Sequence, residues 1–136
     1  MPFVRIDPVI PFPPARRRAV GDAVQAAMVS SLGIPPDDRF QIVGAPAAEI
    51  FFDAGYLGIE RTDGLVMIEI HLAAGRSLEK KKALFKAVHD ALVGLGMRGE
   101  DVMIHLVETE AVNWSFGKGL AQYAEAMPAH LKPPSP

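Results

Sequence analysis

The chain begins Met1-Pro2, so removal of the initiator methionine would leave the ring nitrogen of proline as a free secondary amine. A chain-terminal amine titrates near neutral pH, unlike the amine of a lysine side chain. Burial in an apolar pocket would lower its pKa, whereas a nearby carboxylate would raise it. Such an amine can act as a base, as an acid or, by condensing with a carbonyl, as an electron sink.

A second residue suited to chemistry, Arg76, lies directly before a predicted helix. Its planar guanidinium can bind a carboxylate through two parallel hydrogen bonds. The free amides at a helix N-terminus favour anions as well. An amine base together with a carboxylate-binding arginine would suit proton transfer on small carbonyl or enol compounds that carry a carboxylate.

Composition and spacing exclude several other kinds of site. The chain has no cysteine, so disulfides, thiolate zinc sites and cysteine nucleophiles are excluded. The histidines lack close metal-ligand spacing, although His71 and His105 can share one sheet face and remain candidates for a polar site. Gly117-Lys118-Gly119 lacks the rest of a phosphate-binding loop. We expect no metal and no cofactor.

The charges of the chain nearly balance, with 14 Lys and Arg against 16 Asp and Glu, a formal net charge of −2. Basic clusters at residues 16–18 and 80–82 each open a helical pattern, and we interpret them as solvated helix faces. Nucleic-acid binding needs a larger cationic field. The chain shows no apolar run of membrane-spanning length and no signal-peptide pattern. We therefore expect a cytoplasmic protein without nucleic-acid or membrane partners.

Two stretches of the chain predict the same strand–helix–strand order. In the first, residues 3–7 and 40–43 are expected strands, and the helix over residues 15–32 is ended by Gly33. In the second, residues 66–72 and 102–107 are expected strands, and the helix is capped by Ser77 and ended by Gly96. The two helices carry apolar stripes with helical spacing, at Val20, Ala23, Val24, Ala27 and Met28 and at Leu84, Val88, Ala91, Leu92 and Leu95.

The two halves also match in residue detail. The segment RRRAV at residues 16–20 corresponds in position to KKKAL at residues 80–84, and Asp38 corresponds to Asp101. We predict an α+β fold in one domain over residues 1–136, with β-α-β units over about residues 2–44 and 65–108 and a tail over 109–136. Right-handed crossovers make the strands parallel within each unit. The two units then join into a four-stranded sheet with both helices on one face.

The second face of this sheet has no cover within one chain. It would carry polar Glu69, His71 and His105 together with apolar Met67 and Met103. Because exposed apolar surface usually marks an interaction site, we expect the chain to oligomerise. Between the units we predict an extra strand over residues 49–53 and a turn at residues 62–64. The last residues, 132–136, are expected to be disordered.

The Met-Pro start, the short first strand, the doubled β-α-β unit and Gly75-Arg76-Ser77 before a helix rich in Glu and Lys resemble the tautomerase superfamily. Two segments, PDDRFQ at residues 36–41 and NWSFGKG at residues 113–119, resemble its malonate semialdehyde decarboxylase branch. The resemblance extends over nearly the whole chain, up to Gln122. It implies a homotrimer with a site at each N-terminal proline and removal of the initiator methionine.

The resemblance implies roles for five residues of this chain. Pro2 matches the catalytic proline, Asp38 the aspartate that orients proline and substrate, and Arg76 an arginine that binds the substrate carboxylate. Trp114 and Phe116 match residues that line an apolar pocket wall, where they would exclude solvent and strengthen the charges of the site.

We predict a cofactor-independent tautomerase of small carboxylated keto or enol compounds, such as phenylpyruvate-like enols. Decarboxylation of a 3-oxo acid such as malonate semialdehyde, or hydration of an unsaturated acid, is the alternative with the same residues. Ala74 stands where the decarboxylase pattern has a second arginine, which favours tautomerisation, because a carboxylate to be expelled must be held and aligned. An alternative of another class is a non-catalytic oligomeric binding module, which retention of Met1 would favour.

Overall fold

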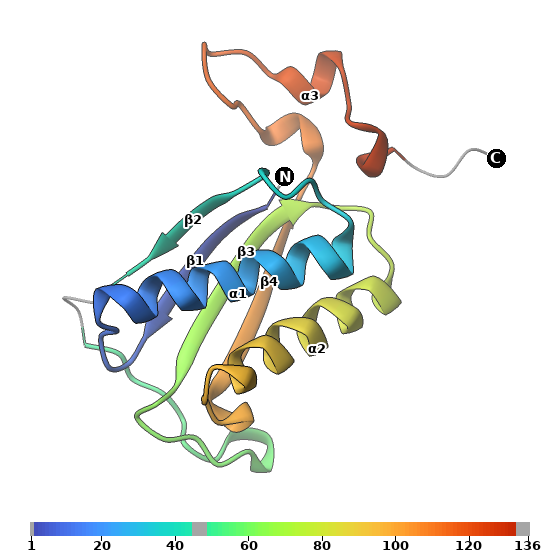
Figure 1. Ribbon diagram of the computed structural model, residues 1–136. Helices are drawn as coiled ribbons and strands as arrows, with labels where there is room; N and C mark the ends of the chain where they lie inside the picture. The colour runs from blue at the N-terminus through green and yellow to red at the C-terminus, as the bar shows by residue number, and fades with distance from the viewer. Residues whose placement is uncertain (1, 45–48, 133–136) are drawn as a thin grey trace.

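The computed structural model describes residues 2–44 and 49–132 (Figure 1). Its main elements, in chain order, are β1 (Phe3–Pro8), α1 (Pro14–Leu32), β2 (Phe40–Val43), β3 (Val66–Ala73), α2 (Leu78–Gly94), β4 (Val102–Thr109) and, in the tail, the short helix α3 (Gln122–Glu125). Single turns of 3-10 helix lie at Tyr56–Gly58, Gly99–Asp101, Ala111–Asn113 and Ala129–Leu131.

The strands form one four-stranded sheet in the order β2-β1-β3-β4. β1 pairs with β2 in parallel, β3 pairs with β4 in parallel, and the two central strands β1 and β3 pair antiparallel. Both long helices cover the same face of this sheet (Figure 1). The α+β fold predicted from two β-α-β units is therefore confirmed, including the strand directions within each unit.

The helix ends follow the signals in the sequence. Gly33 ends α1 in the left-handed conformation, with φ of 70°, and its N–H donates to the carbonyl of Val29 at 3.1 Å. Only glycine adopts this conformation without strain, which explains the stop at this residue. At the start of α2, the hydroxyl of Ser77 accepts a hydrogen bond from the backbone N–H of Lys80 at 3.2 Å.

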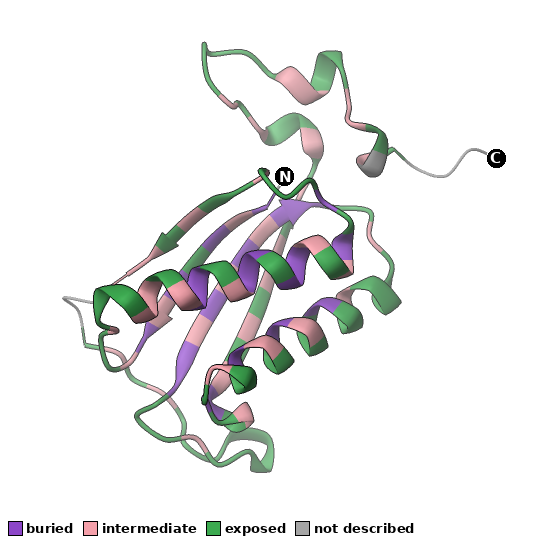
Figure 2. Cartoon of the chain, viewed as in Figure 1, coloured by how far each residue is buried: buried purple, intermediate pink, exposed green. Residues whose placement is uncertain are grey.

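The core lies between the helices and the sheet and draws on both β-α-β units. Figure 2 shows the buried residues concentrated along β1 and β3 and on the inner sides of α1 and α2. Burying one such aliphatic side chain contributes roughly 1.5–3 kcal/mol relative to leaving it exposed. The fully buried members include Val4, Ile6, Val20, Val24, Ile70, Leu72, Leu84, Val88 and Leu92.

The opposite face of the sheet is uncovered within one chain, as the sequence predicted. Phe40 and Ile42 on β2 are 53% and 47% exposed, and Met103 on β4 is 43% exposed. Between them, Glu69 and His71 on β3 contact each other through their side chains. The surface thus combines apolar edge strands with a polar centre.

The extra strand predicted over residues 49–53 is wrong, because these residues pair with no strand of the sheet. The segment instead closes on itself through Arg61, whose Nη1 donates to the carbonyls of Asp53, Tyr56 and Ile59 at 3.4, 3.0 and 3.2 Å. The predicted turn at residues 62–64 is confirmed, with Leu65 N–H donating to the Thr62 carbonyl at 3.0 Å. Apart from Lys132, the predicted disordered end lies outside the described residues.

Asp101 fixes the start of β4 to the loop that precedes β3. It is 2% exposed and accepts hydrogen bonds from the backbone N–H of Thr62 at 2.8 Å and from its hydroxyl at 2.6 Å. Arg98 pairs with the same carboxylate at 3.4 Å. Burial disfavours the charged form, but the hydrogen bonds from Thr62 and the charge of Arg98 outweigh it, so the pKa of Asp101 is lowered.

Replacing Asp101 by Asn removes the charge and one acceptor oxygen, and we expect the free energy of unfolding at pH 7 to fall by about 1–3 kcal/mol. Because the folded-state pKa is lowered, the stabilisation is fully present above the unfolded-state pKa of about 3.9 and is lost as the pH falls through the folded-state value. In urea unfolding, the difference in the free energy of unfolding between wild type and Asp101→Asn should therefore become smaller in acid. Asp63→Asn removes an exposed carboxylate from the same loop, and an equal effect of both substitutions would contradict this role.

Candidate active site

The structure brings the three residues predicted to be catalytic to one end of the sheet. Pro2 is buried directly before β1, Asp38 precedes β2 by two residues, and Arg76 follows β3 by three. Phe3 pairs with Phe40 in parallel and with His71 antiparallel. The beginnings of β1 and β2 therefore meet the end of β3, which gathers segments that are far apart in the sequence.

The loop that carries Asp38 is held by α1. Gln25 of α1 is 6% exposed, and its Nε2 donates to the carbonyls of Asp38 at 3.0 Å and Pro36 at 3.2 Å. The N–H of Asp38 donates to the Pro35 carbonyl at 3.0 Å. These bonds fix the backbone on both sides of a half-buried carboxylate. No pattern in the sequence indicated the part played by Gln25, because its partners lie outside the helix that carries it.

Arg76 presents a hydrogen-bond donor without a protein partner in the part of the chain that the structure describes. Its Nη1 donates to the Ala73 carbonyl at 3.0 Å, whereas Nη2 is buried and makes no hydrogen bond. Burial lowers the pKa of Arg76, and the charges of Glu108, Tyr123 and Asp38 act in the opposite direction. A guanidinium stays charged in proteins, so its buried N–H groups are available to an anionic oxygen.

Tyr123 joins this site, although no motif in the sequence marked it. Burial raises the pKa of Tyr123, and the negative charge of Asp38 raises it further, while the positive charge of Arg76 lowers it. The phenol therefore stays protonated at neutral pH and can donate a hydrogen bond. Arg76 and Tyr123 each affect the pKa of the other, and the charge of Asp38 affects both, so the three side chains lie close enough to interact.

An aromatic group from the tail forms one side of the site. In Figure 1 the tail, orange to red, extends past the end of the sheet where the chain begins. Trp114 stacks on Phe116 with ring centroids 5.8 Å apart, and Phe116 meets Tyr123 edge-on at 4.6 Å. Trp114 Nε1 donates to the Thr109 hydroxyl at 3.0 Å, which attaches the group to the end of β4.

A cavity of about 480 Å³ lies between this aromatic group and the loop before β2. Its volume falls in the range of small-molecule sites, about 300–1,000 Å³. Phe116 lines it, whereas Trp114 stacks on Phe116 and is not among the described residues of the lining. Neither Pro2 nor Arg76 lines it; Arg76 is coupled to it through Asp38 and Tyr123. The lining consists of Pro35, Asp37, Asp38, Phe40, Phe116, Tyr123 and Pro128.

The other candidates from the sequence lie elsewhere. His71 contacts Glu69 on the uncovered sheet face, and His105 is paired with Glu69 in the strand register. Among residues 2–44 and 49–132, no group of three or more acidic or histidine side chains could hold a metal ion. Within the same residues, no helix is both long and apolar enough to cross a membrane.

Known proteins similar to this chain share its length as well as its pattern. A family model described as tautomerase enzyme matches residues 38–117. The probable tautomerase YusQ of Bacillus subtilis (strain 168) is 35% identical over 127 residues, which cover 92% of this chain and 100% of the relative.

Solved structures give the same picture. The FG41 malonate semialdehyde decarboxylase inhibited by 3-bromopropiolate is 40% identical, with a TM-score of 0.83 over 93% of this chain and 98% of the other. A fused 4-OT described as a symmetric trimer is 28% identical, with a TM-score of 0.73 over 91% of this chain and 98% of the other.

Tyr123 offers a spectroscopic test that its side chain shares a site with Arg76 and Asp38. The chain has two tyrosines, so subtracting the phenolate titration of Tyr123→Phe from that of the wild type isolates Tyr123. We expect a midpoint above about 10, the value of an unperturbed tyrosine. Arg76→Gln should raise the midpoint further, because a cation that favours phenolate is lost, and Asp38→Asn should lower it.

Lys86→Gln is the control for this titration, because it removes an exposed cation on α2 that pairs with Asp90. It should leave the midpoint of Tyr123 where it is. A shift in Lys86→Gln as large as the shift in Arg76→Gln would mean that the titration reports the net charge of the protein, and would count against a shared site.

Proposed function

The chain belongs to the tautomerase family of enzymes, and on this basis we propose that it is a cofactor-independent tautomerase of small keto or enol carboxylates. The observation that carries the proposal is the buried Nη2 of Arg76, a charged donor without a partner among the described residues, close to Asp38 and Tyr123. An unpaired buried donor is costly in an empty site, and an anionic substrate oxygen would satisfy it.

Arg76 binds the substrate carboxylate in this proposal. Its Nη1 is already engaged with Ala73, which fixes the plane of the guanidinium relative to the end of β3. The protonated phenol of Tyr123 can donate a second hydrogen bond to the substrate. The ring of Phe116 covers the apolar part of the ligand and keeps water away from the reacting atoms.

Pro2 moves the proton. Pro2 is buried, which favours the neutral amine once Met1 has been removed. The neutral ring nitrogen takes the proton of the enol hydroxyl and donates it to the double-bond carbon that does not bear the oxygen. The enol thereby becomes a ketone and the neutral amine is regenerated. Asp38 holds the protonated amine and the substrate in position during the transfer.

The uncovered sheet face supports a homotrimer as the active form. Phe40, Ile42 and Met103 leave an apolar surface that association would bury. The 28% identical fused 4-OT is described as a symmetric trimer. A partner subunit could then supply further walls of a cavity that one chain leaves open.

Decarboxylation of malonate semialdehyde is the second candidate, favoured by the 40% identity to a malonate semialdehyde decarboxylase. The bond between the carboxylate and the neighbouring carbon would break, a proton would be added to that carbon, and acetaldehyde and carbon dioxide would be the products. Ala74 leaves Arg76 as the sole arginine of the loop over residues 74–77, which favours tautomerisation, because expulsion of a carboxylate requires it to be aligned. Hydration of an unsaturated acid would use the same residues.

The activity test uses phenylenolpyruvate, whose conversion to the ketone is followed by absorbance. Pro2→Ala, which replaces the secondary amine with a primary amine once Met1 is removed, should lower kcat by up to roughly 10²–10⁴-fold, the usual contribution of a general base. Arg76→Gln should lower kcat/KM by roughly ten- to a hundredfold through loss of a charged hydrogen bond. Lys82→Gln, which removes an exposed cation of α2, is the matched control and should keep full activity.

A variant with one extra residue before Pro2 distinguishes the amine from the proline ring. It keeps the side chain but converts the nitrogen to an amide, so its activity should fall at least as far as that of Pro2→Ala, which keeps a primary amine. The intact mass of the purified wild type should lack Met1. Retention of Met1, together with wild-type activity no higher than the uncatalysed rate, would contradict the catalytic proposal and leave the binding module.

Malonate semialdehyde separates the two catalytic candidates. A tautomerase should convert phenylenolpyruvate with a kcat/KM well above that for carbon dioxide release from malonate semialdehyde. A higher kcat/KM for carbon dioxide release from malonate semialdehyde than for conversion of phenylenolpyruvate would assign the protein as a decarboxylase. This holds if Arg76→Gln abolishes the release of carbon dioxide.

A further inference from the structure

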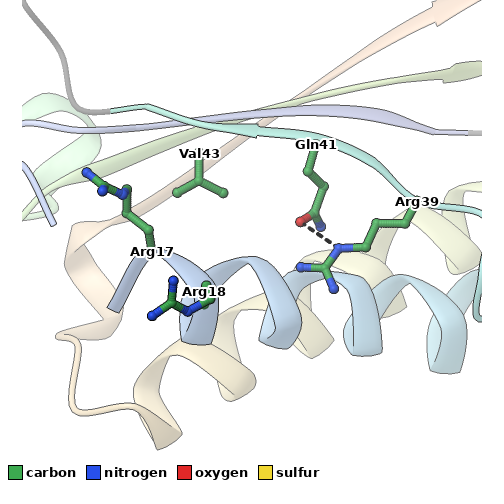
Figure 3. A pocket seen from close by; sticks show the side chains of 5 residues that line it. All are labelled: Arg17, Arg18, Arg39, Gln41 and Val43. Carbon is green, nitrogen blue, oxygen red and sulfur yellow. Dashed lines mark hydrogen bonds between the residues drawn. The ribbon is translucent and has the colours of Figure 1, made fainter. Parts of the chain in front are cut away.

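A second cavity lies between the start of α1 and the edge strand β2, on the side of the sheet that the helices cover (Figure 3). It has a volume of about 380 Å³ and is lined by Arg17, Arg18, Arg39, Gln41 and Val43, which we call the arginine groove. We infer that the arginine groove binds a small molecule that carries phosphate groups and at least two negative charges. This inference does not rest on the proposed activity.

The guanidinium of Arg39 is held in place from two elements. Its Nη1 pairs with Asp22 of α1 at 2.8 Å, and its Nε donates to Gln41 Oε1 at 3.1 Å, the bond drawn in Figure 3. Gln41 in turn donates through Nε2 to the Gly21 carbonyl at 3.0 Å. The groove therefore has one cation, that of Arg39, in a fixed position.

Gly21 makes this arrangement possible. A Cβ at this position would lie 2.9 Å from Gln41 Oε1 and 3.1 Å from Arg39 Nη2, closer than such atoms normally approach. Because glycine has no side chain, the helix can come close enough to β2 for Gln41 to reach its backbone. The floor of the groove is thus determined by close packing of α1 and β2.

The groove carries an excess of positive charge. Within residues 2–44 and 49–132, the pair with Asp22 is the one ion pair that its three arginines make. Arg17 makes a single long hydrogen bond, to the Phe12 carbonyl at 3.4 Å, and Arg18 makes none within the same residues. Two guanidinium groups thus present uncompensated charge and unused N–H donors to whatever enters.

The number of arginines favours a phosphate over a simple carboxylate. One guanidinium satisfies a carboxylate through two parallel bonds, whereas phosphate groups offer more oxygens and more charge. The volume is at the lower end of the range for small-molecule sites. Among the described residues, Val43 is the one aliphatic residue of the lining, so a large apolar ligand would find little to contact there.

Oligomerisation through the uncovered sheet face would leave the groove open. Gln41 binds α1 and so lies on the helix-covered side of β2, whereas its neighbours Phe40 and Ile42 are exposed on the other side. A partner subunit that covers Phe40 and Ile42 therefore contacts the opposite face of the strand.

Calorimetric titration of the full-length wild type with pyrophosphate tests the inference, with acetate as the singly charged comparison. Pyrophosphate should bind, acetate should not, and the affinity should fall with added salt. Arg18→Gln and Arg39→Gln should each weaken binding by about tenfold or more. Lys82→Gln, which removes one positive charge from the exposed side of α2, should leave the affinity unchanged.

Three results would overturn the inference. One is the absence of pyrophosphate binding to the wild type. If, in addition, an oligomer dissociates in Arg18→Gln and Arg39→Gln, the groove binds an acidic segment of a second copy instead. Another is equal weakening by Lys82→Gln. The third is loss of binding in Arg76→Gln with no loss in Arg18→Gln, which would assign the anion to the site at the end of β3.

Discussion

The antiparallel pairing of β1 with β3 is the constraint on which the candidate active site depends. It joins the two β-α-β units into one sheet, and it sets the beginning of the chain against the end of β3. Without this pairing, Pro2 and Arg76 would belong to separate units with no reason to meet. The parallel pairing of β1 with β2 then adds the loop of Asp38 to the same end.

The electrostatics of the site follow from partial burial. Arg76 loses solvation and receives back only one protein hydrogen bond among the described residues, while Asp38, Tyr123 and Glu108 act on its charge from nearby. A buried cation with an unused donor is costly unless an anion completes it. The same physical arrangement would favour an anionic ligand, such as the carboxylate of the proposed substrate.

The two cavities of this fold differ in their lining and therefore suit different ligands. At the end of the sheet, aromatic rings from the tail line a cavity next to the half-buried guanidinium of Arg76, an arrangement that suits a small anion with an apolar part. Beside the edge strand, three arginines with little apolar lining suit a more highly charged ligand. The basic cluster at residues 16–18, interpreted from the sequence as a solvated face, separates accordingly: Arg17 and Arg18 line the groove, whereas Arg16 donates to the Leu95 carbonyl at 3.0 Å.

The sequence by itself determined the elements and their ends, because helical and alternating apolar spacing, Gly33 and Ser77 act locally. It also determined the duplication, and through it the sheet and the uncovered face. It failed over residues 49–53, where apolar residues look like a strand but pair with no strand of the sheet, and where Arg61 binds the carbonyl of Asp53 together with those of Tyr56 and Ile59. Only the tertiary structure decided that Tyr123 joins Asp38 and Arg76, that Gln25 holds the loop of Asp38, and that Trp114 stacks on Phe116. These features depend on contacts between distant segments, and a contact of that kind leaves no periodicity in a single sequence.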